Sequence, residues 1–408
     1  MSIPVSLGIN LKTFQQHTCQ YRRLFPDRTN GILPGSTSVF KLPSTGVIDL
    51  NSISLAYQFS VTNNGAATLS NIQSPQWNIG MIRRLDVICG GASLGLSGLN
   101  DVGFAATQIF NHALTAESTS YRQSTGLEGL VGVPNVAANT TESVPCTIKE
   151  LIGFLGAGDG LRYLPLSLLP AIEIHITWHA VPMWTNGADL TASTIVSQIN
   201  NLRLLYNAME FEDNLVDSLW NARVMKSPLR LPVQNMLYFE SPAFTTAQNL
   251  VATVSSGSVD YIIMGCRPDG YATTLGQTRY STAGGSSSTF LLTVGGQPQT
   301  GWNVNAHEIL SITENSLERS KNPYYAPSIG DYAVYLASRF AYIHRFAFPT
   351  DPVQDGVAWQ TGLNSYGQVL PFECDFAGGD TTNKRLYMLF VLTSVLELSP
   401  GRQVVFLQ

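Results

Sequence analysis

One run of strict alternation constrains the fold of this chain more than any other feature. Over residues 52–61, large apolar side chains occupy every second position, and small or polar side chains lie between them. The apolar set is Ile53, Leu55, Tyr57, Phe59 and Val61. Because successive side chains of a β-strand point to opposite faces, this pattern predicts a strand with one buried face.

Shorter strand-like runs recur along most of the chain and fall into two sets. The first set covers 82–89, 171–180 and 202–211. The second set covers 229–239, 251–254, 259–265, 290–294, 332–335, 340–348, 368–376, 386–398 and 404–407. Turn residues and loops rich in glycine and serine separate the runs, so the sequence predicts an all-β fold. A sandwich or jelly roll of about seven or eight strands in each half fits this spacing.

The size and composition agree with two β-rich units. A chain of 408 residues exceeds one ordinary core and suggests two domains. Charged residues make up only 12% and hydrophobic residues 44%, while glycine and proline number 35 and 21. Such a composition is typical of many turns and broad buried faces, and it excludes a disordered chain. The net charge of −5 gives no general case for nucleic-acid binding.

A helical segment is predicted between the two halves, at residues 212–223. Apolar and long side chains recur there at spacings of three and four, which is typical of an amphipathic helix. The residues at these spacings are Val216, Leu219, Trp220 and Arg223. Acidic residues at 212 and 213 favour a helix start, because they face the positive end of the helix dipole.

These features divide the chain into four parts. We expect an N-terminal arm over 1–45, a first eight-stranded jelly roll over 46–211, a helical linker over 212–228 and a second eight-stranded jelly roll over 229–408. The apolar side of the helix should be buried where the two rolls meet. Trp220 is the residue that we expect at this junction.

The predicted arm differs from the rest of the chain in charge and regularity. Its positively charged residues are Lys12, Arg22, Arg23, Arg28 and Lys41, and its only acidic residue is Asp27. Prolines interrupt any period, and Phe14 and Phe25 give the arm apolar groups to bury against a neighbour. A basic arm of this kind suits contact with nucleic acid, a lipid headgroup surface or an adjoining subunit, and a solvated tail is the alternative.

Cysteine usage and the N-terminal sequence bear on the folding compartment. The five cysteines are scattered without a CxxC pair, which favours reduced and mostly buried thiols. We recognise no signal peptide in the first residues and no apolar run of about 18 residues that would span a membrane. The sequence therefore predicts folding inside a cell.

The sharpest enzymatic pattern is Gly-x-Ser-x-Gly at residues 91–95, with Ser93 as the candidate nucleophile. In α/β-hydrolases such a turn follows a strand, precedes a helix and presents the serine. His307 and His344 lie downstream as candidate bases. The chain lacks the long helices that this fold needs between its strands, so a glycine-rich sheet corner is the favoured interpretation.

Two histidines and a glutamate share one face of the run 171–180. Glu173, His175 and His179 alternate with apolar residues there. A zinc site needs three or four convergent ligands, and no further ligand pattern lies nearby. We therefore predict no metal and no other cofactor, and we expect this face to be exposed or to contact another subunit.

The organisation of the chain resembles the double jelly-roll major capsid proteins of adenoviruses, membrane-containing tailless phages, virophages, polinton-like viruses and large nucleocytoplasmic DNA viruses. The resemblance rests on two β-rich halves joined by the helix at 212–223, and it covers roughly 46–408. The segments that carry it are 49–61 as a first long strand, 81–91 with the helix-like 99–114, and the turn at 361–365.

This resemblance implies a structural protein of the virion and no enzymatic activity. Three copies would form a pseudo-hexagonal capsomer of an icosahedral shell. The partners would be neighbouring capsomers, penton or minor capsid proteins, and an internal membrane or the genome reached by the arm, with no small-molecule substrate. Two alternatives stay open on the sequence: a serine hydrolase that uses Ser93, and a tandem β-sandwich attachment protein that binds glycans.

Overall fold

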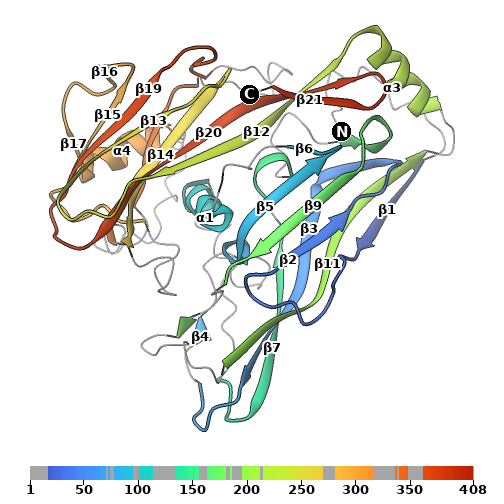
Figure 1. Ribbon diagram of the computed structural model, residues 1–408, viewed down its shortest axis with the longest axis horizontal. Coiled ribbons are helices and arrows are strands. Elements are labelled where there is room, and N and C mark those ends of the chain that lie inside the picture. Colours follow the sequence, from blue (N-terminus) through green and yellow to red (C-terminus); the bar gives the residue numbers. More distant parts are fainter. Residues whose placement is uncertain are drawn as a thin grey trace.

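The computed structural model describes most of the chain. The described residues are 17–69, 72–73, 78–94, 99, 101–113, 135–149, 151–155, 163–180, 184–185, 195–211, 215–269, 281–316, 336–337, 340–347 and 362–407. Figure 1 shows two β-rich bodies side by side along the longest axis, with strands up to 211 in one and strands from 229 in the other.

The first body, which we call the first roll, has two antiparallel sheets, each with a row of four paired strands. One has the order β1 (His17–Leu24), β11 (Ile195–Phe211), β3 (Val47–Asn63), β7 (Thr140–Ile148), with β8 (Tyr163–Pro165) paired to β3. The other has the order β2 (Thr37–Lys41), β9 (Ile172–Trp178), β5 (Ile82–Cys89), β6 (Ala92–Ser93). A short pair, β4 (Ile72–Gln73) and β10 (Trp184–Thr185), lies apart from both.

The second body, the second roll, repeats this arrangement. Its first sheet has the order β12 (Leu229–Glu240), β20 (Lys384–Ser399), β14 (Val259–Pro268), β18 (Tyr342–Arg345), with β21 (Gln403–Leu407) on β20. Its second sheet has the order β13 (Ala247–Thr253), β19 (Pro371–Ala377), β15 (Thr289–Val294), β16 (Gln297–Pro298), with β17 (Val304–Asn305) on β15.

Both rolls have the same topology. When the eight principal described strands of each are numbered along the chain, one sheet reads first, eighth, third, sixth, and the other reads second, seventh, fourth, fifth. Two four-stranded sheets built from consecutive Greek keys define a jelly roll. The predicted pair of eight-stranded jelly rolls therefore matches the observed topology.

The described part of the predicted arm is not an arm. β1 pairs with β11 along its whole length, and β2 pairs with β9, so the first roll already starts at His17 and not at residue 46. β1 could not be predicted from its own sequence. Its described side chains from Thr18 to Arg23 are exposed or half-buried, so they show no alternation of apolar and polar residues. Its strand conformation is set by backbone pairing with β11. Phe14 lies outside the described residues.

Three α-helices are described. α1 (Val102–Ala113) follows the fifth strand of the first roll, and α4 (Ala306–Ser316) follows the corresponding strands of the second. α3 (Leu215–Lys226) joins the rolls. Short 3₁₀ turns, η3 (Asn78–Met81), η4 (Gly153–Leu155) and η5 (Leu166–Leu168), complete the first roll.

The linker helix differs in part from its prediction at 212–223. α3 starts at Leu215 and continues to Lys226, while 212–214 lie outside the described residues. Basic residues in its last turn favour the longer helix, because they face the negative end of the helix dipole. Trp220 and Val224 are buried, but Leu219 is 43% exposed, so the apolar side is narrower than the predicted stripe.

The hydrophobic core has two parts. One fills the interior of the second roll. The other fills the first roll and continues onto the outer face of the sheet that contains β20. Alternate residues of β20 point to the two parts, with Phe390 in one and Leu389 in the other. This double burial explains why β20 reads as a nearly continuous apolar run.

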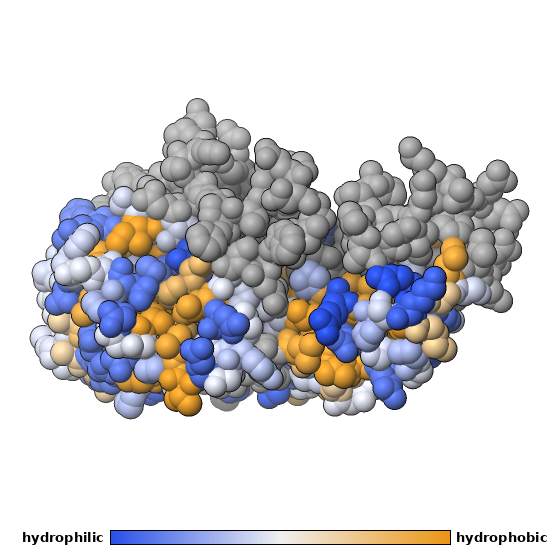
Figure 2. All heavy atoms as spheres, turned by 90° about the horizontal axis from the view of Figure 1, so that it is seen from above, coloured by the Kyte–Doolittle hydropathy of each residue, from blue (hydrophilic) through white to orange (hydrophobic). Residues whose placement is uncertain are grey.

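The outside of the molecule is mixed in character. Figure 2 shows both rolls from above, with hydrophobic and hydrophilic residues interspersed over the coloured atoms of each. None of the described helices is both long enough and apolar enough to cross a bilayer.

Candidate functional site at the junction of the two rolls

α1 lies between the two rolls, and its first turn is built to be buried. Asp101 caps the helix by accepting a hydrogen bond from the Phe104 N–H at 3.0 Å. Gly103 packs so closely on η3 that an added Cβ would lie 2.8 Å from the Gly80 Cα. The Thr107 hydroxyl donates to the Gly103 carbonyl at 2.7 Å, which satisfies another buried polar group. The helix start is thereby fixed on the first roll.

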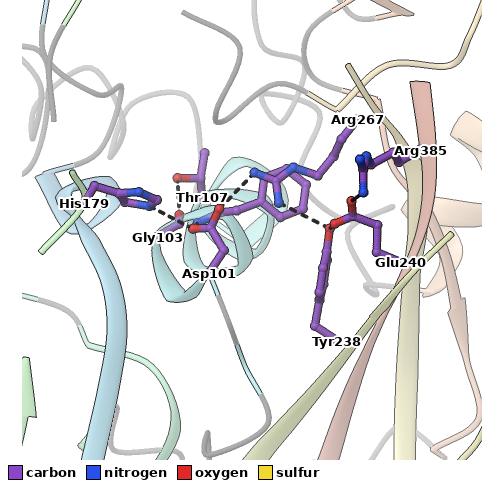
Figure 3. Close-up of polar contacts among 9 residues, drawn as sticks. Asp101, Gly103, Thr107, His179, Tyr238, Glu240, Arg267 and Arg385 are labelled. Atoms are coloured by element: carbon purple, nitrogen blue, oxygen red, sulfur yellow. Dashed lines mark hydrogen bonds and ion pairs between the residues drawn. The ribbon is translucent and has the colours of Figure 1, made fainter. Parts of the chain in front are cut away.

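Asp101 is the centre of a charged group that we call the clasp, made of Asp101, His179 and Arg267. Arg267 comes from β14 of the second roll, and its Nη2 lies 2.9 Å from Asp101 Oδ2. His179 follows β9 of the first roll, and its Nε2 lies 3.1 Å from Asp101 Oδ1. The Arg267 side chain is fully buried. Figure 3 shows the clasp bridging elements of both rolls.

Aromatic rings surround the clasp on the side of the second roll. The Arg267 guanidinium lies 3.8 Å from the centroid of the Phe104 ring. Phe104 in turn meets Tyr238 and Tyr387 edge-on, with centroids 6.2 and 5.0 Å away. A buried cation over an aromatic face is stabilised by the ring quadrupole in addition to its ion pair. The first turn of α1 is therefore held by charge, stacking and packing together.

The polar network continues along the second roll. The Tyr238 hydroxyl accepts from Arg267 Nη1 at 3.2 Å and donates to Glu240 at 2.9 Å. Glu240 pairs with Arg385 at 3.2 Å, and Arg385 pairs with Asp269 at 2.6 Å. Each buried charge of the clasp thus has a partner of opposite sign or a hydrogen bond, as buried charges require.

The clasp sets the protonation of its carboxylate. Burial acts to raise the pKa of Asp101, but Arg267, His179 and the Phe104 N–H act against it, and the net pKa is lowered. The carboxylate is therefore ionised at neutral pH. It serves as a fixed negative charge between two positively polarised groups, which suits a structural lock.

Trp220 lies in the same core cluster as residues of both rolls. Its side chain is 6% exposed, and α3 contacts η5 of the first roll and β20 of the second. A further link joins Gly153 of the first roll to Gln234 of the second, where the backbone N–H donates to the side-chain oxygen at 3.4 Å. The role of Trp220 at the junction of the rolls stays a prediction, and its burial in this shared cluster supports it.

The structure does not give Ser93 the surroundings of a nucleophile. Gly90 and Gly91 have φ of 57° and 87°, and Cys89 pairs with Ala92, which defines a tight β-hairpin. In an α/β-hydrolase, the turn that presents the nucleophilic serine leads directly into a helix. Ser93 instead pairs with Ile88 in the hairpin. Its hydroxyl has no hydrogen-bond partner among the described residues. Ser93 thus lies in a glycine-containing hairpin at a corner of the sheet.

The face with Glu173 and two histidines does not act as one site. Glu173 pairs with Lys41 at 3.2 Å and with His175 at 3.1 Å, whereas His179 turns to Asp101. No group of three or more metal-binding side chains is found among the described residues. The clasp itself was not predicted, because its members are 78 and 166 positions apart.

The predicted arm residues have separate surroundings. Arg22 pairs with Glu210 at 2.8 Å on β11. Arg28 donates from Nε to the Asn30 carbonyl at 3.1 Å. Arg23 is exposed, and Phe25 is 59% exposed. The structure does not gather these side chains into one cluster, and their role as a contact surface stays a prediction.

Only one of the five cysteines is exposed, namely Cys19 on β1. Burial raises the pKa of Cys89 to about 11 and that of Cys146 to about 12, so these thiols stay protonated at neutral pH. We expect one thiol of the native chain to react rapidly with a disulfide reagent at pH 8, and all five after unfolding. The Cys19→Ser variant should show no rapid phase, and a persisting rapid phase would contradict the burial of the other thiols.

Comparison with solved structures places this architecture among known ones. The chain is similar to the PBCV-1 virus capsid, with a TM-score of 0.62, 11% identity, and coverage of 97% of this chain and 98% of that chain. It is similar to the Sputnik virophage structure, with a TM-score of 0.59, 10% identity, and coverage of 98% and 89%. It is also similar to the Faustovirus major capsid protein, with a TM-score of 0.55, 11% identity, and coverage of 95% and 91%.

These likenesses extend over both rolls and confirm the predicted fold class. The chain has the double jelly-roll fold of viral major capsid proteins. No protein-family model and no curated protein matches the sequence. The fold is therefore recognisable in three dimensions at identities of 10–11%.

Proposed function

We propose that this protein is a structural major capsid protein that trimerises into pseudo-hexagonal capsomers of an icosahedral virion shell. The observation that carries the proposal is the repetition of one strand order in two rolls that are locked together by the clasp and a shared core. Three such chains supply six similar rolls around a threefold axis. Closed symmetry then allows a shell to form from one repeated set of contacts.

The junction has a direct role in this proposal. A capsomer tiles a shell only if its rolls keep one relative angle, because an error in each subunit accumulates around the ring. The clasp and the shared core oppose any hinge at α3, since opening the junction would expose both apolar surface and a buried ion pair. Rigidity between the rolls is therefore a functional property of the protein.

The partners in this proposal are neighbouring capsomers, together with penton or minor capsid proteins. Contact with an internal membrane or with the genome would involve the basic N-terminal region, for which Arg28 supplies positive charge at the surface. The hydrolase and glycan-binding alternatives gain no support from the described residues. The proposed location of the protein is the virion.

The oligomeric state tests the proposal. We expect the purified protein to sediment at three times its mass of 44.3 kDa, and negative-stain images to show hexagonal outlines with threefold symmetry. Incubation with a broad serine-hydrolase probe should leave the folded protein unlabelled. A stable monomer at micromolar concentration in every buffer tested would overturn the proposal.

A further inference from the structure

The contact between the two rolls of one chain provides a template for a contact between chains. Within the chain, the outer face of the sheet β12-β20-β14-β18 packs on α1 of the first roll, through Arg267, Tyr238 and Tyr387. The equivalent sheet of the first roll is β1-β11-β3-β7, and the helix equivalent to α1 is α4. In Figure 1, α4 lies toward one end of the molecule and β1 and β11 toward the other.

If the template holds, α1 should be covered on both sides within one chain, and α4 should have one side left exposed. The burial of the two helices differs in this way. Side chains of α1 from Val102 to Gln108 are all buried, because α1 has a roll on each side. On α4, His307, Glu308 and Ser311 are exposed. α4 thus has an inner side in its own roll and an outer side that nothing in the described chain covers.

The outer side of α4 is rigid and has an aromatic anchor. Asn305 caps the helix by accepting from the Glu308 N–H at 3.1 Å, and the Glu308 carboxylate accepts from the Asn305 N–H at 3.0 Å. The same carboxylate accepts from Trp302 Nε1 at 3.2 Å, and Trp302 is 58% exposed. Exposed tryptophan held in one position is a frequent centre of protein interfaces.

The outer face of the sheet β1-β11-β3-β7 carries many polar side chains. Hydroxyl and amide pairs cross it, including Ser60 with Ser143 at 2.8 Å and Asn201 with Gln58 at 2.7 Å. Arg23 and Arg203 give this face positive charge, opposite in sign to Glu308. A face with many polar groups suits a hydrated interface between subunits that fold first and associate afterwards.

We propose that this outer face of one copy binds α4 and Trp302 of a second copy, in the manner in which the second roll binds α1 within the chain. The inference rests on the proposed trimer and names the surfaces that form it. Because the two surfaces differ and lie at opposite ends of the molecule, the contact is head-to-tail, and in the proposed trimer three such contacts close the ring. Because the proposed contact between copies involves charged and polar side chains, high salt should weaken it more than it weakens the contact between the two rolls of one chain.

Cross-linking tests the pairing of surfaces directly. In a Cys19→Ser background the remaining thiols are buried, so introduced cysteines report specifically. We expect Gln58→Cys combined with Ser311→Cys to give covalent dimers and trimers with a short bismaleimide. Each single variant should give none. The matched control combines Ser311→Cys with Asn64→Cys, an exposed residue roughly 20 Å further along β3 and its turn, and should cross-link poorly.

A second measurement uses Trp302. The Trp302→Ala variant should raise the trimer dissociation constant about thirtyfold for each contact, without changing the melting temperature of the dissociated chain. Tyr366→Ala removes another aromatic side chain of the second roll, 68% exposed, and should change neither quantity. A trimer that forms without the Gln58–Ser311 cross-link and tolerates Trp302→Ala would overturn this inference while leaving the proposed function intact. The absence of any trimer in the wild type would overturn both.

Discussion

Replacement of Asp101 by asparagine is expected to lower the free energy of unfolding by about 3–5 kcal/mol, because it removes the countercharge of a buried cation. Arg267 is fully buried, and its ion pair with Asp101 crosses the junction between the rolls. The Phe104 ring offers Arg267 a weaker, second interaction that does not replace a carboxylate. Urea unfolding followed by tryptophan fluorescence measures the loss.

A double-mutant cycle separates the ion pair from general damage to α1. Arg267→Met removes the charge and keeps an apolar chain, and the double variant Asp101→Asn/Arg267→Met leaves no buried charge at this position. We expect the double variant to be more stable than Asp101→Asn alone, since buried pairs are often replaced by apolar residues at little cost. Additive losses in the cycle would mean that the two side chains do not act as a pair.

The same pair predicts a pH dependence. The pKa of Asp101 is lowered in the folded chain from its ordinary value of 3.8, so its stabilising effect is complete above that value and is lost as the pH falls through the folded-state pKa. The stability difference between wild type and Asp101→Asn should therefore be constant near neutral pH and shrink in acid. A difference that grows as the pH falls below 3.8 would contradict this assignment.

Replacement of Trp220 by alanine is expected to have a comparable effect for a different reason. The indole is 6% exposed within a core shared by both rolls, and truncation of a buried tryptophan costs about 3–5 kcal/mol. We expect the fraction of trimer to fall more than the stability of either roll, since the cavity lies where the rolls meet. Sedimentation gives the trimer fraction, and hydrogen exchange reports each roll separately.

Leu219→Ala is the matched control, because Leu219 is the neighbour of Trp220 on α3 and is 43% exposed. It should change the trimer fraction little. If Trp220→Ala weakened both rolls equally and independently, its side chain would not act at the junction.

Sequence patterns predicted strands best where exactly one face is buried. The alternation at 52–61 lies within β3, and its apolar residues line the interior of the first roll. β20 lacks alternation because both of its faces are buried, and β1 lacks it because its faces are exposed. Strand order in a jelly roll depends on which distant segments pair, and local side-chain periodicity carries little information about that.

The junction was predictable only in part. Helical spacing predicted an apolar side that includes Trp220 and Leu219; Trp220 is buried but Leu219 is exposed, and the role of Trp220 at the junction stays a prediction. The position of Asp101 just before a helical run is a recognisable sign of an N-cap residue, and Asp101 does cap α1. Arg267 stands at the end of the apolar strand β14, but its partner comes from the other roll, and a single sequence does not specify such a distant pairing.

The position of β20 has a consequence for synthesis of the protein. In the second roll this late strand inserts between β12 and β14, and it also supplies Leu389 and Val391 to the junction. While the ribosome is still making β20, the second roll is unfinished and Phe104 of α1 lacks its contact with Tyr387. Truncated translation products therefore expose apolar surface and lack the finished second roll, which favours their removal by cellular proteases.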